Sequence, residues 1–151
     1  MWKHPADGTS WGYRSLSWRQ DLPRTLESGC FDGVFFAEVL GTYDVCGASR
    51  EAALRGAVQI PGIDPTLLIS ALAACTENLG FAVTVWTSHH ASYHTARLFS
   101  TLDHLTAGRV GWNIVTSYLA AAERQGLGEI LPQDARYGWA EEYVDVCVKL
   151  W

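Results

Sequence analysis

The sequence predicts an α/β fold with a parallel sheet, because short apolar runs alternate along the chain with longer segments of helical periodicity. Strands and helices follow one another in turn, which favours right-handed crossovers between neighbouring strands. Neither an internal repeat nor a low-complexity linker interrupts this order. With 151 residues, of which 48% are hydrophobic and 18% charged, the chain has the composition of a single globular domain.

The first predicted elements are a helix and a buried strand. Residues 16–27 have helical character, and Gly29 after Ser28 is a typical stop signal. Residues 33–39, Gly-Val-Phe-Phe-Ala-Glu-Val, are almost wholly apolar, as in a strand that is covered on both faces. We therefore expect Glu38 to stand near the end of a buried strand.

The next helix is predicted to begin at a proline. Asp64 is suited to cap a helix N-terminus and Pro65 to occupy its first position, so that a helix is expected over residues 66–78. A strand is predicted over residues 81–87. The polar residues 88–90 then form a turn.

The stretch of residues 101–117 carries the clearest local signals. An apolar stripe with helical spacing predicts a helix over residues 93–105, and its members are Tyr93, Ala96, Phe99, Leu102 and Leu105. Gly108 can adopt the left-handed conformation that ends a helix, and the β-prone residues 109–115 follow as a strand. A last helix is predicted from residue 137 to about residue 151.

Polar side chains stand at the C-terminal ends of all three predicted strands. They are Glu38 on the first strand, Thr87 and Ser88 on the second, and Asn113 and Ser117 on the third. In parallel α/β folds, ligands bind at this end of the sheet. For any single Ser or Thr, capping of the following helix is the simpler explanation. The coincidence at three strand ends favours a small-molecule site.

Charge and composition speak against several classes of partner. The formal net charge is −5 and no lysine or arginine cluster occurs, so neither nucleic acid nor an anionic membrane is expected as a partner. No run of about 18 apolar residues and no signal-peptide pattern is present, which favours a soluble, cytoplasmic protein. The cysteines are expected to be buried free thiols, and they are Cys30, Cys46, Cys75 and Cys147.

The sequence lacks the motifs of two common kinds of site, a histidine metal site and a Rossmann-type dinucleotide site. His90 and His94 are spaced i, i+4, and His89 lies next to them, but the His-Glu-x-x-His arrangement is absent, so no metal site is predicted. The glycines do not form Gly-x-Gly-x-x-Gly after a strand, which speaks against a dinucleotide site of the Rossmann type.

Several motifs resemble those of the luciferase-like flavin monooxygenases, in the group that acts on nitrilotriacetate, dibenzothiophene sulfone and long-chain alkanes. The resemblance covers nearly the whole chain, and the block from Asp103-His-Leu-Thr to Trp112-Asn-Ile-Val-Thr-Ser is its most specific part. The long-chain alkane type looks closest, through Gly41-Thr-Tyr-Asp-Val and Ala57-Val-Gln-Ile-Pro. The other matching segments are Phe31-Asp-Gly-Val-Phe-Phe-Ala-Glu, Asp64-Pro, Arg136-Tyr137 and the run from Glu142 to Trp151.

The resemblance implies part of a TIM (β/α)8 barrel, with about the second to the fourth strand and their covering helices in a parallel sheet. Residues 1–151 would form a single luciferase-like domain that lacks the first strand and the C-terminal half of the barrel. The implied activity is that of an FMN-dependent monooxygenase, an oxidoreductase. Such an enzyme takes reduced FMN from a separate NAD(P)H-dependent flavin reductase. It then oxygenates a small apolar or organosulfur substrate with O2, through a flavin peroxide. Members of the family suggest a homo-oligomer in the full-length form.

The resemblance also implies roles for particular residues. The cofactor-binding positions that it assigns are Glu38, Thr87, Ser88, Asn113, Ser117 and Tyr137. Tyr43 and Gln59 match positions that line the substrate pocket, and Tyr118 replaces a family histidine there, so these three are the candidate catalytic residues. Glu38 stands where the family usually has aspartate, and Trp86 replaces a small residue, so weaker flavin binding is expected.

A second function remains open on the sequence alone. The chain starts in a loop before a helix and stops within a helix, so it resembles a fragment. Three parallel strands by themselves leave both outer strands with open edges, which pair readily with other chains. The alternative is therefore a truncated, non-catalytic remnant or an interaction module that keeps the half-barrel fold.

Overall fold

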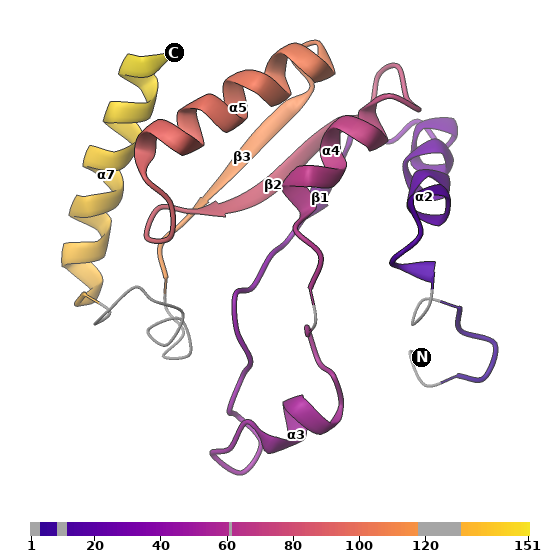
Figure 1. Cartoon of the computed structure of the whole chain (residues 1–151), viewed down its shortest axis with the longest axis horizontal. Helices are drawn as coiled ribbons and strands as arrows, with labels where there is room; N and C mark the ends of the chain where they lie inside the picture. Colours follow the sequence, from indigo (N-terminus) through magenta and orange to yellow (C-terminus); the bar gives the residue numbers. More distant parts are fainter. Residues whose placement is uncertain (1–3, 9–11, 61, 118–130) are drawn as a thin grey trace. The chain divides into compact units, whose positions relative to one another are not determined.

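A computed structural model of the chain describes residues 4–8, 12–60, 62–117 and 131–151. Helices and strands alternate along these residues (Figure 1). In chain order the described elements are α2 (Leu16–Ser28), β1 (Gly33–Phe36), α3 (Glu51–Arg55), α4 (Pro65–Ala73), β2 (Gly80–Trp86), α5 (Ser92–Thr106), β3 (Val110–Val115) and α7 (Gln133–Leu150).

The strands form one sheet with the order β1-β2-β3 (Figure 1). β1 and β2 are parallel, with Gly33 beside Gly80 and Phe36 beside Val83. The central position of β2 explains its composition, because its residues Phe81 to Trp86 are buried apart from Ala82.

β3 runs parallel to β2 on its other side. The N–H of Phe81 donates to the carbonyl of Arg109 at 2.8 Å, and the N–H of Thr87 donates to that of Val115 at 3.1 Å. Since both partners advance together along the chain, the two strands point the same way. The predicted α/β fold with a parallel sheet is confirmed.

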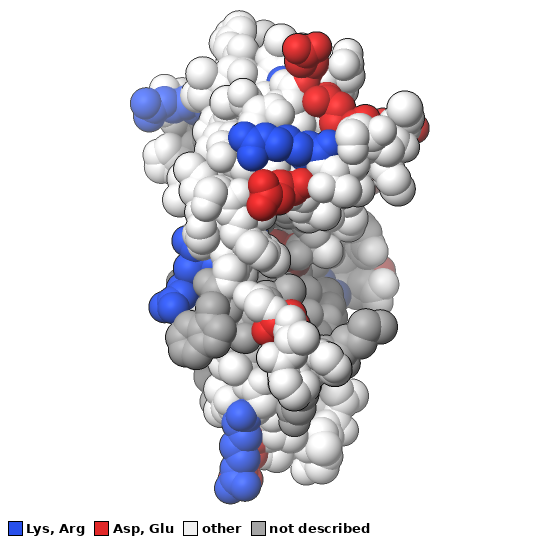
Figure 2. Space-filling view, turned by 90° about the vertical axis from the view of Figure 1, so that its right-hand side faces the viewer, with Lys and Arg blue, Asp and Glu red and all other residues white. Residues whose placement is uncertain are grey.

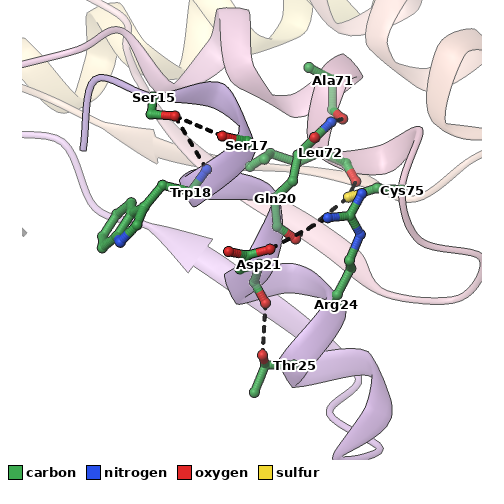
Figure 3. A network of polar contacts seen from close by, with 10 residues as sticks. All are labelled: Ser15, Ser17, Trp18, Gln20, Asp21, Arg24, Thr25, Ala71, Leu72 and Cys75. Carbon is green, nitrogen blue, oxygen red and sulfur yellow. Dashed lines mark hydrogen bonds and ion pairs between the residues drawn. The ribbon is translucent and has the colours of Figure 1, made fainter. Parts of the chain in front are cut away.

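The chain divides into two compact units, which are described separately. The first comprises Met1–Phe36, Ile63–Val83 and Leu102–Gly111, and the second Ala37–Gly62, Thr84–Thr101 and Trp112–Trp151. In the first unit, α2 is tied to α4 and to the turn after it (Figure 3). Gln20 Nε2 donates to the Ala71 carbonyl at 3.0 Å, and the Cys75 thiol lies 3.0 Å from the Leu72 carbonyl oxygen and 3.8 Å from that of Gln20.

Glu27 fixes the turn between α4 and β2. One of its carboxylate oxygens accepts hydrogen bonds from the backbone N–H groups of Glu77, Asn78 and Leu79, at 2.9, 2.6 and 3.0 Å. These bonds lower the pKa of Glu27, with the Asn78 bond the largest cause, and the charge of Arg109 acts in the same direction.

Arg109, the residue before β3, bonds to the same turn. Its guanidinium donates to the carbonyls of Ala73, Leu79 and Thr106, at 3.1, 2.9 and 2.9 Å, and to Thr76 Oγ1 at 3.0 Å. The carbonyl of Ala73, the last residue of α4, thus accepts from a side chain outside the helix. Because α4 ends at Ala73, the predicted helix over residues 66–78 is too long.

In the second unit, Trp112 is the centre of an aromatic cluster. Its ring stacks on Phe99 of α5, with centroids 5.3 Å apart, and lies 6.2 Å from Tyr143 of α7 and 6.4 Å from Trp151. Its Nε1 donates to the carbonyl of Val85 at 2.9 Å. Because Trp112 belongs to β3, this cluster packs residues of α5 and α7 against one face of that strand.

Some predicted elements differ in extent or burial from the observed ones. The strand predicted over residues 33–39 ends at Phe36 and is not buried, since the Phe35 side chain is 54% exposed. β1 lies at the edge of the sheet, with a paired strand on one side only among the described residues. α7 starts at Gln133 instead of residue 137, with Asp134 in its first turn, and the short helix α3 was not expected.

The signals around α5 are confirmed in their central part. Ala96, Phe99 and Leu102 are buried, whereas Tyr93 and Leu105 at the two ends of the stripe are exposed. Gly108 has the expected left-handed backbone, with φ +80°, and its N–H donates to the Asp103 carbonyl at 2.9 Å. The cysteines are free, as predicted, but burial was wrong for two of them: Cys30 and Cys46 are exposed, Cys75 is half-buried and Cys147 is buried.

Candidate functional site

The ends of β2 and β3 bring four predicted site residues together. The bond from Thr87 N–H to the Val115 carbonyl places Thr87 and Ser88 beside the end of β3. Asn113 is the fourth residue of β3, and Ser117 follows that strand. The candidate site is therefore built from two neighbouring parallel strands and the turns that follow them.

Asn113 is held by a residue of the neighbouring strand. Its side-chain Nδ2 lies 3.1 Å from Oγ1 of Thr84, which is buried in β2. Side chains alternate along a strand, so Asn113 lies on the face opposite to Trp112 and its aromatic cluster. The bond to Thr84 uses one half of the amide and leaves the carbonyl half available as an acceptor. Thr84 thus orients Asn113 without saturating it.

Thr87 carries an unsatisfied buried hydroxyl. The residue is 1% exposed, and Oγ1 has no hydrogen-bond partner among the described residues. Its carbonyl, in contrast, accepts from Trp139 Nε1 of α7 at 3.3 Å. A buried polar atom without a partner costs about 1–3 kcal/mol, so such atoms are rare in folded proteins. The Thr87 hydroxyl is suited to receive a polar ligand atom.

His89 and Ser117 form a second polar pair across the two strand ends. His89 Nε2 lies 3.2 Å from Ser117 Oγ, and Ser117 is 3% exposed. The His89 ring also meets Trp86 edge to face, with centroids 5.9 Å apart. Burial lowers the pKa of His89, and the neighbouring His90 lowers it further. The imidazole is therefore neutral near pH 7.

The remaining predicted site residues lie elsewhere in the fold. Glu38 and Tyr43 are half-buried on the connection between β1 and α3, so Glu38 does not belong to a strand. Gln59 is exposed in the turn after α3, with a left-handed φ of +61°. Tyr137 is 56% exposed near the start of α7, and Tyr118 lies outside the described residues.

Sequence reasoning missed three residues of this region. Thr84 and Trp139 gave no signal, because their contacts with Asn113 and Thr87 depend on the pairing of β2 with β3 and on the packing of α7. His89 was considered only as a metal ligand. The position of a histidine directly after the polar end of a strand is the signal that could have identified it.

An open pocket of about 110 Å³ lies beside α7, lined by Ser92, Trp139, Glu142, Tyr143 and Val146. Sites for cofactors and drug-sized ligands typically measure about 300–1,000 Å³, so this pocket is too small to hold a flavin.

On the face seen in Figure 2, Lys and Arg side chains lie interspersed with Asp and Glu. Among the described residues, His, Cys, Asp and Glu do not gather in threes that could hold a metal ion. No described helix has the length and apolar character needed to cross a membrane.

Comparison with known proteins identifies related chains. The sequence model of a family described as luciferase-like monooxygenase matches residues 2–151. The long-chain alkane monooxygenase of Geobacillus thermodenitrificans (strain NG80-2) is 49% identical over 100% of this chain and 34% of its own length. The dimethyl-sulfide monooxygenase of Hyphomicrobium sulfonivorans is 48% identical over 99% of this chain and 31% of its own.

Solved structures agree with these matches. A crystal structure of long-chain alkane monooxygenase superposes with a TM-score of 0.93, over 99% of this chain and 35% of that one. A riboflavin lyase, solved with modified FMN and riboflavin, is 30% identical and superposes with a TM-score of 0.88 over 99% of this chain and 34% of its own. The chain thus spans about a third of the length of these relatives.

Proposed function

The chain belongs to the luciferase-like monooxygenase family, and we propose that it supplies the cofactor-holding strand ends of an FMN-dependent monooxygenase. The observation that carries the proposal is the group of buried polar side chains at the ends of β2 and β3, around Asn113 and Thr87. In this proposal residues 1–151 form one incomplete luciferase-like domain, without the first strand and the C-terminal half of the barrel.

The polar groups at these strand ends fit a flavin. An isoalloxazine ring carries an N–H donor beside carbonyl and ring-nitrogen acceptors, and the Asn113 amide can serve either kind. The buried Thr87 hydroxyl can likewise donate or accept. Neutral amides and hydroxyls hold the ring without protonating it. When bound, reduced FMN supplies the electrons that activate O2.

Other residues have subsidiary roles in the proposal. Ser88, Ser117, Glu38 and Tyr137 contribute to cofactor binding, as the family resemblance implies. Their support differs, because Ser88 and Ser117 lie at the strand ends, whereas Tyr137 is exposed on α7.

Three residues are proposed for the substrate side. Tyr43 and Gln59 would line the substrate pocket, and Tyr118 would stand there in place of a family histidine. A phenol is a poor base near neutral pH, so we assign no proton transfer to Tyr118.

The proposed substrate is a small apolar or organosulfur molecule. It is supported by relatives that are named for long-chain alkanes and for dimethyl sulfide. A separate NAD(P)H-dependent reductase would supply the reduced FMN, which favours the cytoplasm, where NAD(P)H is available. The full-length enzyme would be a homo-oligomer.

A chimera tests the proposal directly. Residues 1–151 replace the matching third of the Geobacillus long-chain alkane monooxygenase, which is 49% identical to them. The chimera is titrated with reduced and oxidised FMN under anaerobic conditions, and oxygenation of a long-chain alkane is then assayed with a flavin reductase. The unaltered Geobacillus enzyme is the positive control, and the isolated chain is titrated in parallel.

Saturable FMN binding by a folded chimera, with alkane oxidation, is the expected result. A chimera with a native circular dichroism spectrum and cooperative unfolding that binds no FMN would contradict the proposal. That outcome would favour the non-catalytic alternative, in which the open edges of β1 and β3 pair with another chain.

A further inference from the structure

His89 lies beside the proposed cofactor site but belongs to neither strand. It follows Ser88 in the turn after β2, and its half-buried ring is fixed from two directions. One contact is the edge-to-face packing on Trp86, with an angle of 82° between the ring planes, and the other is the 3.2 Å approach of Nε2 to Ser117 Oγ. The imidazole therefore joins the end of β2 to the end of β3.

Ser117 has hydrogen-bonding capacity beyond this contact. A serine hydroxyl offers one donor and two acceptor lone pairs, and the contact with His89 uses one of them. At 3% exposure the remaining capacity is largely shielded from solvent. The hydroxyl can therefore make a further hydrogen bond, to a ligand that reaches the ends of β2 and β3.

We propose that His89 is a positioning residue of the flavin site, which fixes the orientation of the Ser117 hydroxyl so that its remaining valence meets the cofactor. This inference rests on the proposed function. Without the imidazole, the hydroxyl is free to rotate among its three staggered positions, and binding must then pay the cost of selecting one.

The protonation state of His89 agrees with this role. Its pKa is lowered by burial and by His90, so the ring is neutral at pH 7 and Nε2 can either accept from Ser117 or donate to it. In both cases the hydroxyl is oriented by a group that carries no charge. The neighbouring His90 is exposed and serves as a matched control.

A double-mutant cycle tests whether His89 acts through Ser117. FMN dissociation constants are measured by flavin fluorescence on the chimera with His89→Leu, Ser117→Ala and both changes together, and thermal unfolding verifies that each variant is folded. Ser117→Ala is expected to weaken binding roughly fivefold, the effect of about 1 kcal/mol from one hydrogen bond. His89→Leu is expected to weaken it about threefold, the cost of selecting one of three hydroxyl positions. The double variant is expected to bind like Ser117→Ala, because the two residues act as a unit.

Two further variants separate orientation from packing. His89→Gln keeps a polar side-chain end that can reach Ser117, and it is expected to restore the affinity to within about twofold of wild type. His90→Leu is expected to leave FMN affinity unchanged.

Each contrary result overturns the inference in a recognisable way. Additive losses in the cycle, no loss with His89→Leu, or a folded His89→Gln variant as weak as His89→Leu would show that His89 does not act through Ser117. In these cases the unsubstituted chimera still binds FMN, so the proposed function stands. A folded, unsubstituted chimera without FMN binding would instead overturn the proposed function and this inference with it.

Discussion

The two ends of β2 differ in how far their polar side chains are satisfied. At the amino end, Glu27 accepts three backbone N–H groups, and Arg109 donates to three carbonyls and a hydroxyl. At the carboxyl end, Thr87 Oγ1 has no partner among the described residues, and half of the Asn113 amide is free of the bond to Thr84.

This difference separates stability from binding within one strand. Saturated polar networks hold the chain in one conformation, whereas a buried group without a partner costs stability unless a ligand satisfies it. Substitutions at the amino end should therefore change the free energy of unfolding. Substitutions at the carboxyl end should mainly change the affinity for the cofactor.

The largest expected effect is that of Arg109→Ala. It removes four hydrogen bonds from a charged donor and leaves the carbonyls of Ala73 and Leu79 without these bonds. We expect the free energy of unfolding of the 151-residue chain to fall by about 3 kcal/mol, measured by urea denaturation with tryptophan fluorescence.

Arg97→Ala is the matched control for this change, since Arg97 is exposed on α5. Its effect should stay within about 0.5 kcal/mol. Equal losses for the two arginine variants would show that the network around Arg109 contributes nothing particular to stability.

The next effect concerns the carboxyl end. Asn113→Ala in the chimera should weaken FMN binding by about 1–3 kcal/mol, or roughly 5- to 150-fold, because a buried hydrogen bond to the ring is lost. Asn78→Ala at the opposite end of β2 is the control, and it should leave the affinity unchanged. An unaltered dissociation constant for the Asn113 variant, measured by fluorescence titration, would remove this residue from the cofactor site.

Local signals in the sequence were sufficient for most of the fold. The cap at Asp64, whose Oδ1 accepts from Thr66 N–H at 2.9 Å, and the left-handed Gly108 depend on neighbouring residues only, and both were predicted. The segment after α4 is held by Glu27 and Arg109, which are distant in sequence, so helical periodicity could not show that residues 74–78 leave the helix. Local pattern also could not show that β1 lies at an edge of the sheet.

The candidate site was predictable in its location but not in its internal contacts. The rule that ligands bind at the C-terminal ends of parallel strands led to Thr87, Asn113 and Ser117. The partners Thr84 and His89 follow from the register between β2 and β3, which no short motif encodes. For Glu38 the expectation failed in part, since the strand ends before it.

A smaller effect distinguishes two buried threonines. Thr106 is 0% exposed, and its Oγ1 accepts from Arg109 N–H at 3.2 Å, whereas Thr87 is 1% exposed and its hydroxyl has no partner among the described residues. Thr106→Val should lower the free energy of unfolding by about 1 kcal/mol, and Thr87→Val should raise it by about the same amount. Both are measured by urea denaturation without flavin.

The two threonine variants are also expected to differ in their affinity for FMN, and here Thr87→Val is the more damaging change. Thr87→Val should weaken FMN binding by the chimera, because it removes a hydroxyl that the ligand uses, and Thr106→Val should not. If Thr87→Val destabilised the flavin-free chain as much as Thr106→Val does, the hydroxyl of Thr87 would have a partner and the contrast between the two ends of β2 would be lost.

The smallest expected effect is a change in pH dependence at Glu27. Its pKa in the folded chain lies below the ordinary value of 4.5, because the backbone N–H bonds, that of Asn78 first, stabilise the carboxylate. The resulting contribution to stability is present above about pH 4.5 and is lost as the pH falls through the folded pKa. Glu27→Gln should therefore unfold more readily than wild type at pH 7, and the difference should shrink as the pH falls below 4.5. Glu77→Gln, at an exposed position of the same turn, is the matched control. A constant difference between Glu27→Gln and wild type across this range would mean that the side chain stabilises the turn through its shape and not through its charge.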